Sequence, residues 1–416
     1  MRTVRLGERT ITAIGCGDLS LAIAASRGVD RRDVERALTI AFELSLSLAD
    51  IHPGEDDAER LAGDVIRSLR MRDTVVAAIT LPLLDGRDTP IDRLPLAYIQ
   101  ARVETALRNT KLDALPLVQL PLRPSWLRSK AWPEIEGTAA RLVREGKVLA
   151  WGARLDDEDI AHDSAAADDA RAERAVSGAW ISHDSRDAVR RQPDPDEPVV
   201  PPALSDELHA LLAVPWLVSL SVPYSVCARQ AELLLAAATA PVPLGPEAPP
   251  PPPASLSSSL ILSPFEITAP TPTTSPKPGR RSALAVFARQ PLAGGTLAGT
   301  IGPGVKLSPR DDRNAIDDAA LDRIALEVAR LSALVRTMPP AATSTEASRG
   351  VLERTKKRDH AGAVTLAELA LRYVIDRGAV ALPRLHRHTL VTDALIAATS
   401  EPLPEQANAW ILDDKR

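Results

Sequence analysis

One stretch, residues 74–120, carries the pattern that decides the fold. It reads TVVAAI (74–79), an apolar run, then PLAYIQARVETALR (95–108), whose apolar residues recur at helical spacing, then LPLVQL (115–120), a second apolar run. Short runs that are almost wholly apolar are typical of strands covered on both faces, and a helix between two such strands joins them in parallel. The stretch therefore predicts one βαβ unit of a parallel sheet.

The same unit repeats on both sides of this stretch. Strands are expected at 12–15, 44–49, 74–79, 115–120, 148–152, 217–222, 283–287 and 380–382, and helices at 33–44, 58–69, 95–108, 134–145, 228–238, 366–376 and 389–398. Eight strands that alternate with helices predict an α/β protein, a single eight-stranded parallel β/α (TIM) barrel over residues 1–416. The first fifteen residues alternate around Gly7 and predict an N-terminal hairpin. Functional residues are then expected at the C-terminal ends of the strands.

Three long insertions interrupt the alternation. Residues 156–209 are acidic and Ala-rich, residues 241–281 are rich in Pro and Ser, and residues 308–358 carry an extra helix expected at 315–335. The second insertion holds most of an unusual excess of proline, 36 in the chain, including a run of five at 249–253. It predicts an extended arm or lid in which SLILSPFEIT (259–268) docks as an added strand, or alternatively a spacer or a ligand for proline-recognition modules.

Composition narrows the class of partner. The 416 residues carry a net charge of −5 and no run of basic residues, which argues against binding to nucleic acid or to anionic membranes. No run approaches the roughly 20 apolar residues of a membrane helix. The two cysteines, Cys16 and Cys227, are too few for a disulfide framework and are interpreted as thiols of a reducing compartment. A soluble, cytoplasmic protein is expected, with no prediction of its oligomeric state.

Eight short segments, in order and at the spacing of an eight-unit barrel, resemble the aldo-keto reductase superfamily. They are RLGERTITAIGCG (5–17), LAD (48–50), AERLAG (58–63), RDTVVAA (72–78), ALRNTKLDALPLVQL (106–120), REGKVLAWG (144–152), FARQPLAGGTLAG (287–299) and LAELALRYVIDRGAVALP (366–383). The resemblance covers nearly the whole chain apart from the insertions. It implies reduction of carbonyl groups with NADPH by an Asp, a Tyr acid, a Lys that lowers the pKa of the Tyr, and a His that orients the carbonyl.

At the four catalytic positions that the resemblance implies, this chain keeps only the Asp. Asp50 matches it, Glu55 stands at the Tyr position, Thr80 at the Lys position and Pro121 at the His position. Hydride delivery to a carbonyl creates an alkoxide that needs a proton donor and a positive or donor environment. Thr80 carries no charge and Pro121 has no N–H, so ordinary reductase chemistry is expected to be absent. Asp50 and Glu55 stay tentative catalytic residues.

The cofactor positions implied by the resemblance are mixed. Arg154 follows the fifth strand, where the family has a Ser that holds the nicotinamide amide, and Ser221 replaces a Gln on the sixth strand. The Pro-Leu turn beside the pyrophosphate is kept as Pro291 and Leu292. The remaining candidates are the basic segment Arg384, His386 and Arg387 at the adenosine-phosphate position, and the aromatic side chains Trp151, Tyr224 and Phe287, which lie near strand ends and could stack on a nicotinamide.

Each of these motifs also has an interpretation without a functional role. DIHPGEDD (50–57) has carboxylates and an imidazole at metal-ligand spacing, but a solvated acidic loop is favoured, and no metal is expected. Asp50 alone is equally consistent with a structural hydrogen-bond acceptor. The 384–388 segment is either a phosphate or carboxylate site or an exposed basic turn. Cys227 is favoured as a core thiol over a nucleophile.

The sequence thus predicts an aldo-keto-reductase-like barrel without reductase activity that binds a peptide or small-molecule ligand at the C-terminal face. Such a protein would act beside a partner enzyme in a specialised biosynthetic pathway, or use Asp50 and Glu55 in cofactor-independent acid/base chemistry. No cofactor is expected. Two alternatives keep NADP(H): a divergent NADP-dependent reductase or other oxidoreductase with Glu55 as the acid, and a barrel that senses NADP without turnover.

Overall fold

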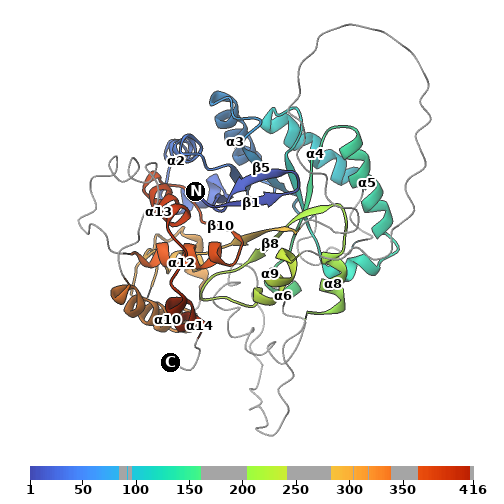
Figure 1. The fold of residues 1–416 in the computed structure, drawn as a ribbon. Coiled ribbons are helices and arrows are strands. Elements are labelled where there is room, and N and C mark those ends of the chain that lie inside the picture. Colours follow the sequence, from blue (N-terminus) through green and yellow to red (C-terminus); the bar gives the residue numbers. More distant parts are fainter. Residues whose placement is uncertain are drawn as a thin grey trace, which may run out of the picture.

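The computed structural model describes residues 1–83, 91, 96–160, 204–240, 283–302, 304–316, 318–338 and 364–412. Eight parallel strands form one sheet in the order β10-β9-β8-β7-β6-β5-β4-β3, so each strand pairs with the next along the chain. A parallel bridge between Ile14 and Ala381 joins the two end strands and closes the sheet. Helices surround the strands (Figure 1). The α/β barrel predicted from the sequence is confirmed.

The strands are β1 (Thr3–Leu6), β2 (Arg9–Thr12), β3 (Cys16–Leu19), β4 (Leu48–Ile51), β5 (Val76–Thr80), β6 (Leu117–Pro121), β7 (Trp151–Arg154), β8 (Leu217–Pro223), β9 (Ala285–Arg289) and β10 (Val380–Leu382). The α-helices are α1 (Leu21–Ser26), α2 (Arg31–Glu43), α3 (Asp56–Ser68), α4 (Leu96–Thr110), α5 (Trp132–Arg144), α6 (Asp157–Ile160), α8 (Asp206–Leu212), α9 (Glu232–Thr239), α10 (Asp318–Thr337), α12 (Leu366–Asp376), α13 (His388–Thr399) and α14 (Glu405–Leu412). Short 3₁₀ turns are η3 (Pro124–Arg128), η4 (Ala293–Gly295) and η5 (Asp312–Ala315).

Helix starts follow the local sequence. Asp30 caps α2 by accepting a hydrogen bond from the N–H of Asp33, and Thr365 caps α12 in the same way from Glu368. These side chains satisfy N–H groups that have no partner inside the helix. Each capped helix then turns an apolar face toward the sheet, so the capping residues help to set where each βα unit begins.

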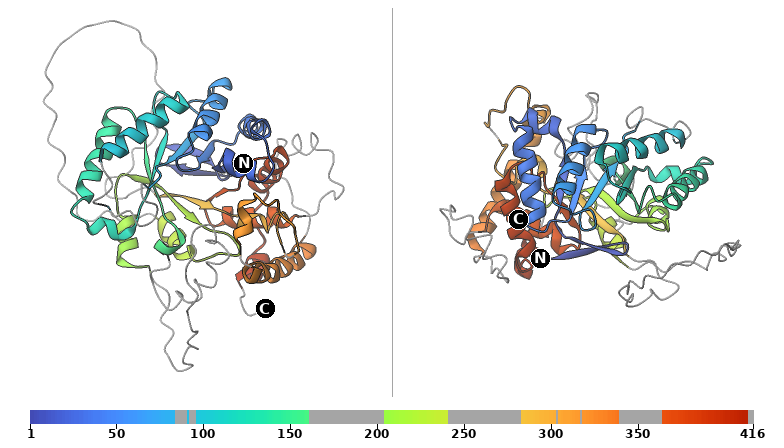
Figure 2. Two further views of the ribbon diagram at one scale, coloured as in Figure 1. Left: turned by 180° about the vertical axis from the view of Figure 1, so that it is seen from behind. Right: turned by 90° about the horizontal axis from the view of Figure 1, so that it is seen from above.

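The hairpin β1–β2 lies at one end of the barrel, as the right-hand view of Figure 2 shows. Its Leu6 and Ile11 pack with inward-facing residues of the strands, including Leu48, Leu117 and Phe287, in a small core inside the barrel. Because side chains of a strand alternate between its two faces, the next inward positions lie one layer closer to the opposite end. Those positions are polar. They are Asp50, Thr80, Gln119, Ser219, Ser221, Arg154 and Arg289.

Closure of the barrel depends on a close approach between β3 and β10. The N–H of Gly15 donates to the carbonyl of Ala381 at 3.0 Å, and the N–H of Gly17 donates to Pro383 at 2.9 Å. A Cβ atom on Gly17 would lie 2.0 Å from the carbonyl oxygen of Leu382. Only glycine allows the two strands this contact, which brings the segments after β3 and β10 together at one edge of the mouth.

Three strands were predicted to begin too early by three or four residues. The first barrel strand was expected at 12–15, but residues 9–12 belong to the hairpin and the strand begins at Cys16. The second was expected at 44–49 and lies at Leu48–Ile51, and the fifth was expected at 148–152 and lies at Trp151–Arg154. Around the first strand, residues 11–17 are all buried, so hydropathy alone does not mark where the paired segment starts.

The three insertions are described only in part. The extra helix expected at 315–335 is α10, and Arg330 of this helix stacks on Trp410 of α14, with the guanidinium carbon 4.6 Å from the ring centroid. Of the 156–209 insertion, α6 and the start of α8 are described. The 241–281 insertion, with its expected added strand, lies outside the described residues and stays a prediction, as do the insertion boundaries. Among the described helices, none is long and apolar enough to cross a membrane.

Candidate functional site

A cleft of about 360 Å³ opens at the C-terminal ends of the strands. Residues from the ends of β3, β4, β7, β9 and β10 line its floor, and the segments that follow β9 and β10 form its walls. Six of its lining side chains are arginines and two are aspartates, so the cleft carries an excess of positive charge. Such a lining favours an anionic ligand.

Asp50 lies at the floor of the cleft with 1% of its surface exposed. Its Oδ1 accepts a hydrogen bond of 2.9 Å from Nε2 of Gln119, and its Oδ2 accepts one of 3.3 Å from the N–H of Asp18. Burial raises the pKa of Asp50, although the nearby Arg154 acts in the opposite direction. Both carboxyl oxygens accept hydrogen bonds from other barrel strands, β6 and β3, which supports a structural role for this residue.

Asp18 ties the first strand to the last. Its Oδ1 contacts Nδ1 of His52 at 2.6 Å, and its Oδ2 accepts hydrogen bonds from the guanidinium of Arg384, at 2.9 Å from Nε. Burial acts to raise the pKa of Asp18, but the charge of Arg384 and the hydrogen bond from His52 outweigh it, so the pKa lies well below its usual value. Asp18 has a φ of 47°, a conformation that few residues other than Gly, Asn and Asp adopt. The strain is consistent with a residue held in place by its ion pairs.

Two guanidinium groups face the inner end of the cleft. Arg289, 7% exposed, reaches from β9 across the end of β8 and donates to the carbonyl of Leu155 and, at 2.9 Å, to Oδ1 of Asp156. Arg154 at the end of β7 is partly buried, and its Nη1 atom is buried without a hydrogen-bond partner among the described residues. Burial lowers the pKa of Arg154, and the charge of Arg289 lowers it further.

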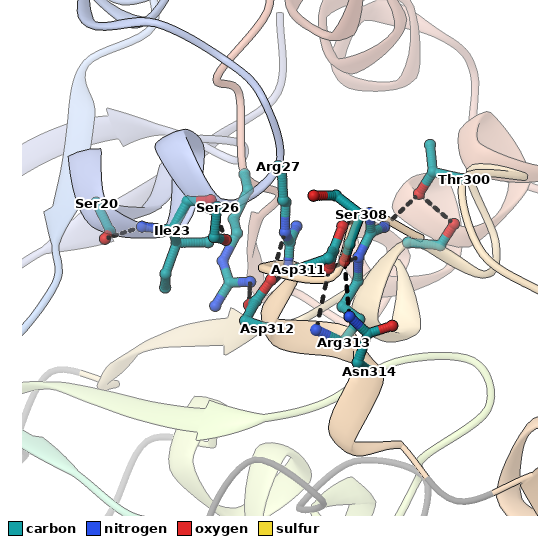
Figure 3. A network of polar contacts seen from close by, with 12 residues as sticks. Ser20, Ile23, Ser26, Arg27, Thr300, Ser308, Asp311, Asp312, Arg313 and Asn314 are labelled. Atoms are coloured by element: carbon teal, nitrogen blue, oxygen red, sulfur yellow. Dashed lines mark hydrogen bonds and ion pairs between the residues drawn. The ribbon is translucent and has the colours of Figure 1, made fainter. Parts of the chain in front are cut away.

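Ion pairs between separate segments build the rim of the cleft (Figure 3). Arg27, just after α1, forms a two-pronged pair with Asp312, at 2.9 and 3.0 Å. Arg313 pairs with Asp311 and donates from Nη1 to Oγ1 of Thr300 at 3.0 Å. These contacts fix the segment after β9 against α1, so that this wall of the cleft is preformed.

The opposite wall is the segment between β10 and α13. Burial and the charges of Arg27, Arg387 and Arg384 lower the pKa of His386 to about 4. Arg387 is exposed and is the N-cap residue of α13, where its side chain makes no capping hydrogen bond. The first N–H groups of a helix lack internal partners and carry partial positive charge. A positive helix start, a neutral imidazole and two arginines together suit an anion such as a phosphate.

Glu55 does not line the cleft. Its Oε1 accepts hydrogen bonds from the N–H groups of Leu21 at 2.6 Å and Ala22 at 3.0 Å. The carboxylate therefore caps the start of α1. The structure also separates the acidic residues of 50–57, because Asp50 points to Gln119, His52 to Asp18 and Glu55 to α1. Among the described residues, no three His, Cys, Asp or Glu side chains are grouped to hold a metal ion.

The remaining predicted site residues divide between the cleft and the core. Pro291, Leu292, Arg384, His386 and Arg387 line the cleft, together with Asp50 and Arg154. Thr80 and Ser221 are buried in the polar layer below it. Pro121 lines a second cavity of about 200 Å³. Trp151, Tyr224 and Phe287 are each no more than 2% exposed and do not line the cleft.

The aromatic candidates are held in the core by specific contacts. Trp151 faces outward from β7, stacks edge-on against Trp216 and donates from Nε1 to the carbonyl of Ala139 at 3.3 Å. Tyr224 donates its hydroxyl hydrogen bond to Glu232 and stacks on Tyr373. Their rings are therefore committed to packing the sheet against its helices. None of them is placed to stack on a ligand in the cleft.

The catalytic acid of the resemblance has no replacement among the cleft side chains. The chain contains three tyrosines, Tyr98, Tyr224 and Tyr373, and none lines the cleft. The Tyr98 hydroxyl donates to the carbonyl of Pro82 at 2.6 Å, beside the second and third strands of the barrel. Among the described residues, no lysine lines the cleft either. The cleft thus has charge to bind an anion but neither the Tyr nor the Lys of a carbonyl reductase.

Sequence reasoning missed Asp18, Arg27 and Arg289. Asp18 lies within the first barrel strand, β3, whose position was predicted four residues too early, and Arg289 lies two residues beyond the expected end of the strand at 283–287. The rule that barrel function sits at the C-terminal ends of strands would have found both, given the right boundaries. Arg27 directly follows the short helix α1, and no motif or strand end in the sequence pointed to it.

Comparison with known proteins gives matches in structure alone. No known protein family has a sequence profile that matches this chain, and no curated protein sequence matches it. A glycerol dehydrogenase from Gluconobacter oxydans aligns over 98% of this chain and 93% of its own, with a TM-score of 0.54 and 14% identity. An aldo-keto reductase from Bacillus halodurans in its holo form aligns over 99% and 95%, with a TM-score of 0.50 and 14% identity.

This chain has the aldo-keto reductase fold. An aldo-keto reductase from Klebsiella pneumoniae in complex with NADPH also aligns, over 99% of this chain and 93% of its own, at 18% identity and a TM-score of 0.49. A structure from the same organism, at 19% identity, 98% and 93% coverage and a TM-score of 0.48, is a complex with NADP and acetate. The resemblance inferred from the sequence is thus confirmed at the level of the fold. The expectation of no cofactor is corrected by this likeness, because the Bacillus halodurans structure of the same fold is a holo form.

Proposed function

We propose that this barrel binds NADP(H) along the cleft and does not carry out carbonyl reduction with a Tyr acid. The observation that carries the proposal is the wall formed by Arg384, His386 and Arg387 at the start of α13. A neutral histidine with a lowered pKa among arginines marks a site where positive charge is unbalanced. A phosphate group would neutralise that charge and accept hydrogen bonds from the open helix start.

The cleft also suits the pyrophosphate of a dinucleotide. Gly294 and Gly295 follow Leu292 in a tight turn, with φ values of 67° and 107° that favour glycine. A turn without side chains lets the backbone approach a ligand closely. Arg313 lines the cleft on this side and is itself held by Asp311, which keeps the guanidinium in place. Residues after β9 would therefore hold the middle of the dinucleotide, and residues after β10 its phosphate-bearing adenosine end.

A bound nicotinamide supplies a hydride donor or acceptor at the inner end of the cleft. The groups that meet it there are Asp50, Arg154 and Arg289. Both carboxyl oxygens of Asp50 accept hydrogen bonds, from Gln119 and from the N–H of Asp18. An arginine cannot serve as a proton donor in the reaction, because its guanidinium is not deprotonated in proteins. Without a side chain that hands over a proton, reduction of a carbonyl is not completed efficiently. In the described part of the chain, the cleft residues thus support binding of the cofactor and lack a group for the usual proton transfer.

Two finer parts of the sequence-based prediction stay proposals. One is binding of a peptide or a small molecule at the same face. The other is a role beside a partner enzyme in a biosynthetic pathway. Neither is carried by a specific contact among the described residues.

The test is a titration of the full-length protein with NADPH and with NADH, followed by the fluorescence of the reduced nicotinamide. NADPH is expected to bind more tightly than NADH because only NADPH carries the adenosine phosphate. Arg387→Ala removes a charge-assisted contact and is expected to weaken NADPH by about tenfold or more. Arg36→Ala, at an exposed position of α2, is the matched control and should leave the affinity unchanged.

Turnover is measured in the same samples as loss of absorbance of NADPH with a panel of aldehydes and ketones. Binding without turnover is the expected result. Turnover with a carbonyl would contradict the absence of reductase chemistry. Equal affinity for NADPH and NADH, or no binding of either, would contradict the assignment of the wall after β10 as a phosphate site.

A further inference from the structure

Arg154 and Arg289 form a pair of cations at the inner end of the cleft, and the nicotinamide of the proposed dinucleotide carries no negative charge to pair with them. Arg289 is more than nine-tenths buried and lines the cleft. Its Nε atom is buried without a hydrogen-bond partner among the described residues, and so is Nη1 of Arg154. Burial of a guanidinium N–H without an acceptor costs free energy, most of all for a charged group. Two such donors side by side therefore indicate a site for an acceptor that is not part of the described chain.

Arg154 also lies between the cleft and the second cavity. That cavity, of about 200 Å³, is lined by Pro121 at the end of β6, by Leu122 and Arg123 after it, and by Arg154. Three acidic side chains also line it, Asp156, Asp159 and Glu207, of which Asp156 pairs with Arg289 and Glu207 with Arg128. Its volume suits a molecule of a few heavy atoms. A ligand that lies in it brings its end against the guanidinium of Arg154. Pro121 and Arg154, which are paired at the ends of the neighbouring strands β6 and β7, border it on the side of the barrel.

The charges around the pair favour a single negative charge on the ligand. Asp156 pairs with Arg289, and Asp18 pairs with Arg384. Arg154 has no ion pair among the described residues, since Asp50 accepts its hydrogen bonds from Gln119 and from the N–H of Asp18. One guanidinium without an ion pair matches a monoanion better than a phosphate dianion. The planar fork of a guanidinium also matches a carboxylate in shape, through two parallel N–H···O bonds.

We propose that the inner end of the cleft binds a small carboxylate, with its charged group between Arg154 and Arg289 and its organic part in the second cavity. The proposal rests on the proposed function in one respect: the carboxylate would lie at the inner end of the same cleft whose outer end takes the dinucleotide. It assigns to the protein a class of ligand, small 2-oxo or other monocarboxylic acids, rather than neutral aldehydes and ketones.

The experiment is isothermal calorimetry on the full-length protein with pyruvate and with diacetyl. The two molecules have the same size and the same carbonyl group, but only pyruvate carries a carboxylate. Pyruvate is expected to bind and diacetyl to show no binding at the same concentration. Inorganic phosphate is titrated as a second anion and is expected to bind more weakly than pyruvate at this end of the cleft.

Three variants locate the site. Arg154→Met keeps an unbranched stem but removes the guanidinium and its charge, and is expected to weaken pyruvate binding by at least tenfold. Arg154→Lys keeps the charge without the fork and should lose less. Arg387→Ala, at the outer end, is expected to leave pyruvate binding unchanged while it weakens NADPH. Thermal unfolding of each variant is measured alongside, so that loss of the fold is distinguished from loss of the site.

The outcomes separate this proposal from the proposed function. Equal binding of pyruvate and diacetyl, or pyruvate affinity unchanged in folded Arg154→Met and Arg154→Lys, would overturn the carboxylate site, whatever NADPH does. Tighter binding of phosphate than of pyruvate, lost in Arg154→Met, would overturn the choice of a carboxylate. Binding of pyruvate that depends on Arg154 in a protein that does not bind NADPH would support the carboxylate site and contradict the dinucleotide site.

Discussion

The ionisation of His386 gives the sharpest prediction for the outer end of the cleft. In the free protein, burial and the charges of Arg27, Arg387 and Arg384 lower its pKa to about 4, against about 6.5 for an unperturbed histidine. A phosphate bound beside it opposes these positive charges and favours the imidazolium. Binding of NADP is therefore expected to raise the pKa of His386 and to take up a proton below pH 6.5.

The magnitude follows from the two pKa values. If binding restores the ordinary value of about 6.5, the protonation of His386 tightens binding by up to about 25-fold between pH 7.5 and pH 5. The adenosine phosphate titrates in the same range, so the wild type alone is not informative. The informative quantity is the ratio of the dissociation constant of His386→Asn to that of the wild type, because the ligand's own titration cancels in it.

The assay is calorimetric titration with NADP at pH 7.5 and at pH 5. The ratio is expected to rise by at least fivefold as the pH falls. His209→Asn is the control, because this exposed histidine lies on α8, away from the cleft, and its ratio should stay near one at both values. If the ratio for His386→Asn is the same at the two pH values, His386 does not face the bound phosphate and the placement of the anion is wrong.

Two further predictions concern the contacts that shape the mouth of the barrel. Gly17→Ala would place a Cβ atom 2.0 Å from the carbonyl oxygen of Leu382 and is expected to lower the unfolding free energy in urea by about 3 kcal/mol, whereas Gly137→Ala, with no atom within 4 Å, should not lower it. Asp18→Asn keeps a residue that tolerates a positive φ but breaks the ion pair with Arg384, for a loss of about 2 kcal/mol at pH 7. Because the folded-state pKa of Asp18 is lowered, the stabilisation exists above the unfolded-state pKa of about 3.9 and is lost as the pH falls, so the wild type and the variant should converge in acid.

The fold could be predicted from the sequence because the same pattern, an apolar strand followed by an amphipathic helix, repeats along the chain. Each βα unit buries its strand on both faces and one face of its helix, so hydropathy and spacing are sufficient to count eight units. The first strand was misplaced because Ile11, Ile14 and Cys16 are all buried, some in the hairpin and some in the barrel. Hydropathy does not distinguish the two, since only the pairing of the strands separates them.

The sequence predicted those cleft residues that lie at strand ends or in a locally basic segment. Arg154 and the segment from Arg384 to Arg387 lie in the cleft because strand ends meet at one face of a barrel. Phe287 and Trp151 were misjudged because their depth and direction depend on strand parity. Phe287 points inward but lies one layer below Arg289, and Trp151 points outward toward the helices. Glu55 was misjudged because its partner, the start of α1, is distant in sequence.

The most direct test of this account is the affinity of the full-length protein for NADPH compared with NADH, with turnover followed in the same cuvette. The account predicts tighter binding of NADPH, weakened by Arg387→Ala and not by Arg36→Ala, with no oxidation of NADPH in the presence of aldehydes or ketones. Equal or absent binding of the two dinucleotides, or steady turnover of a carbonyl, would contradict it.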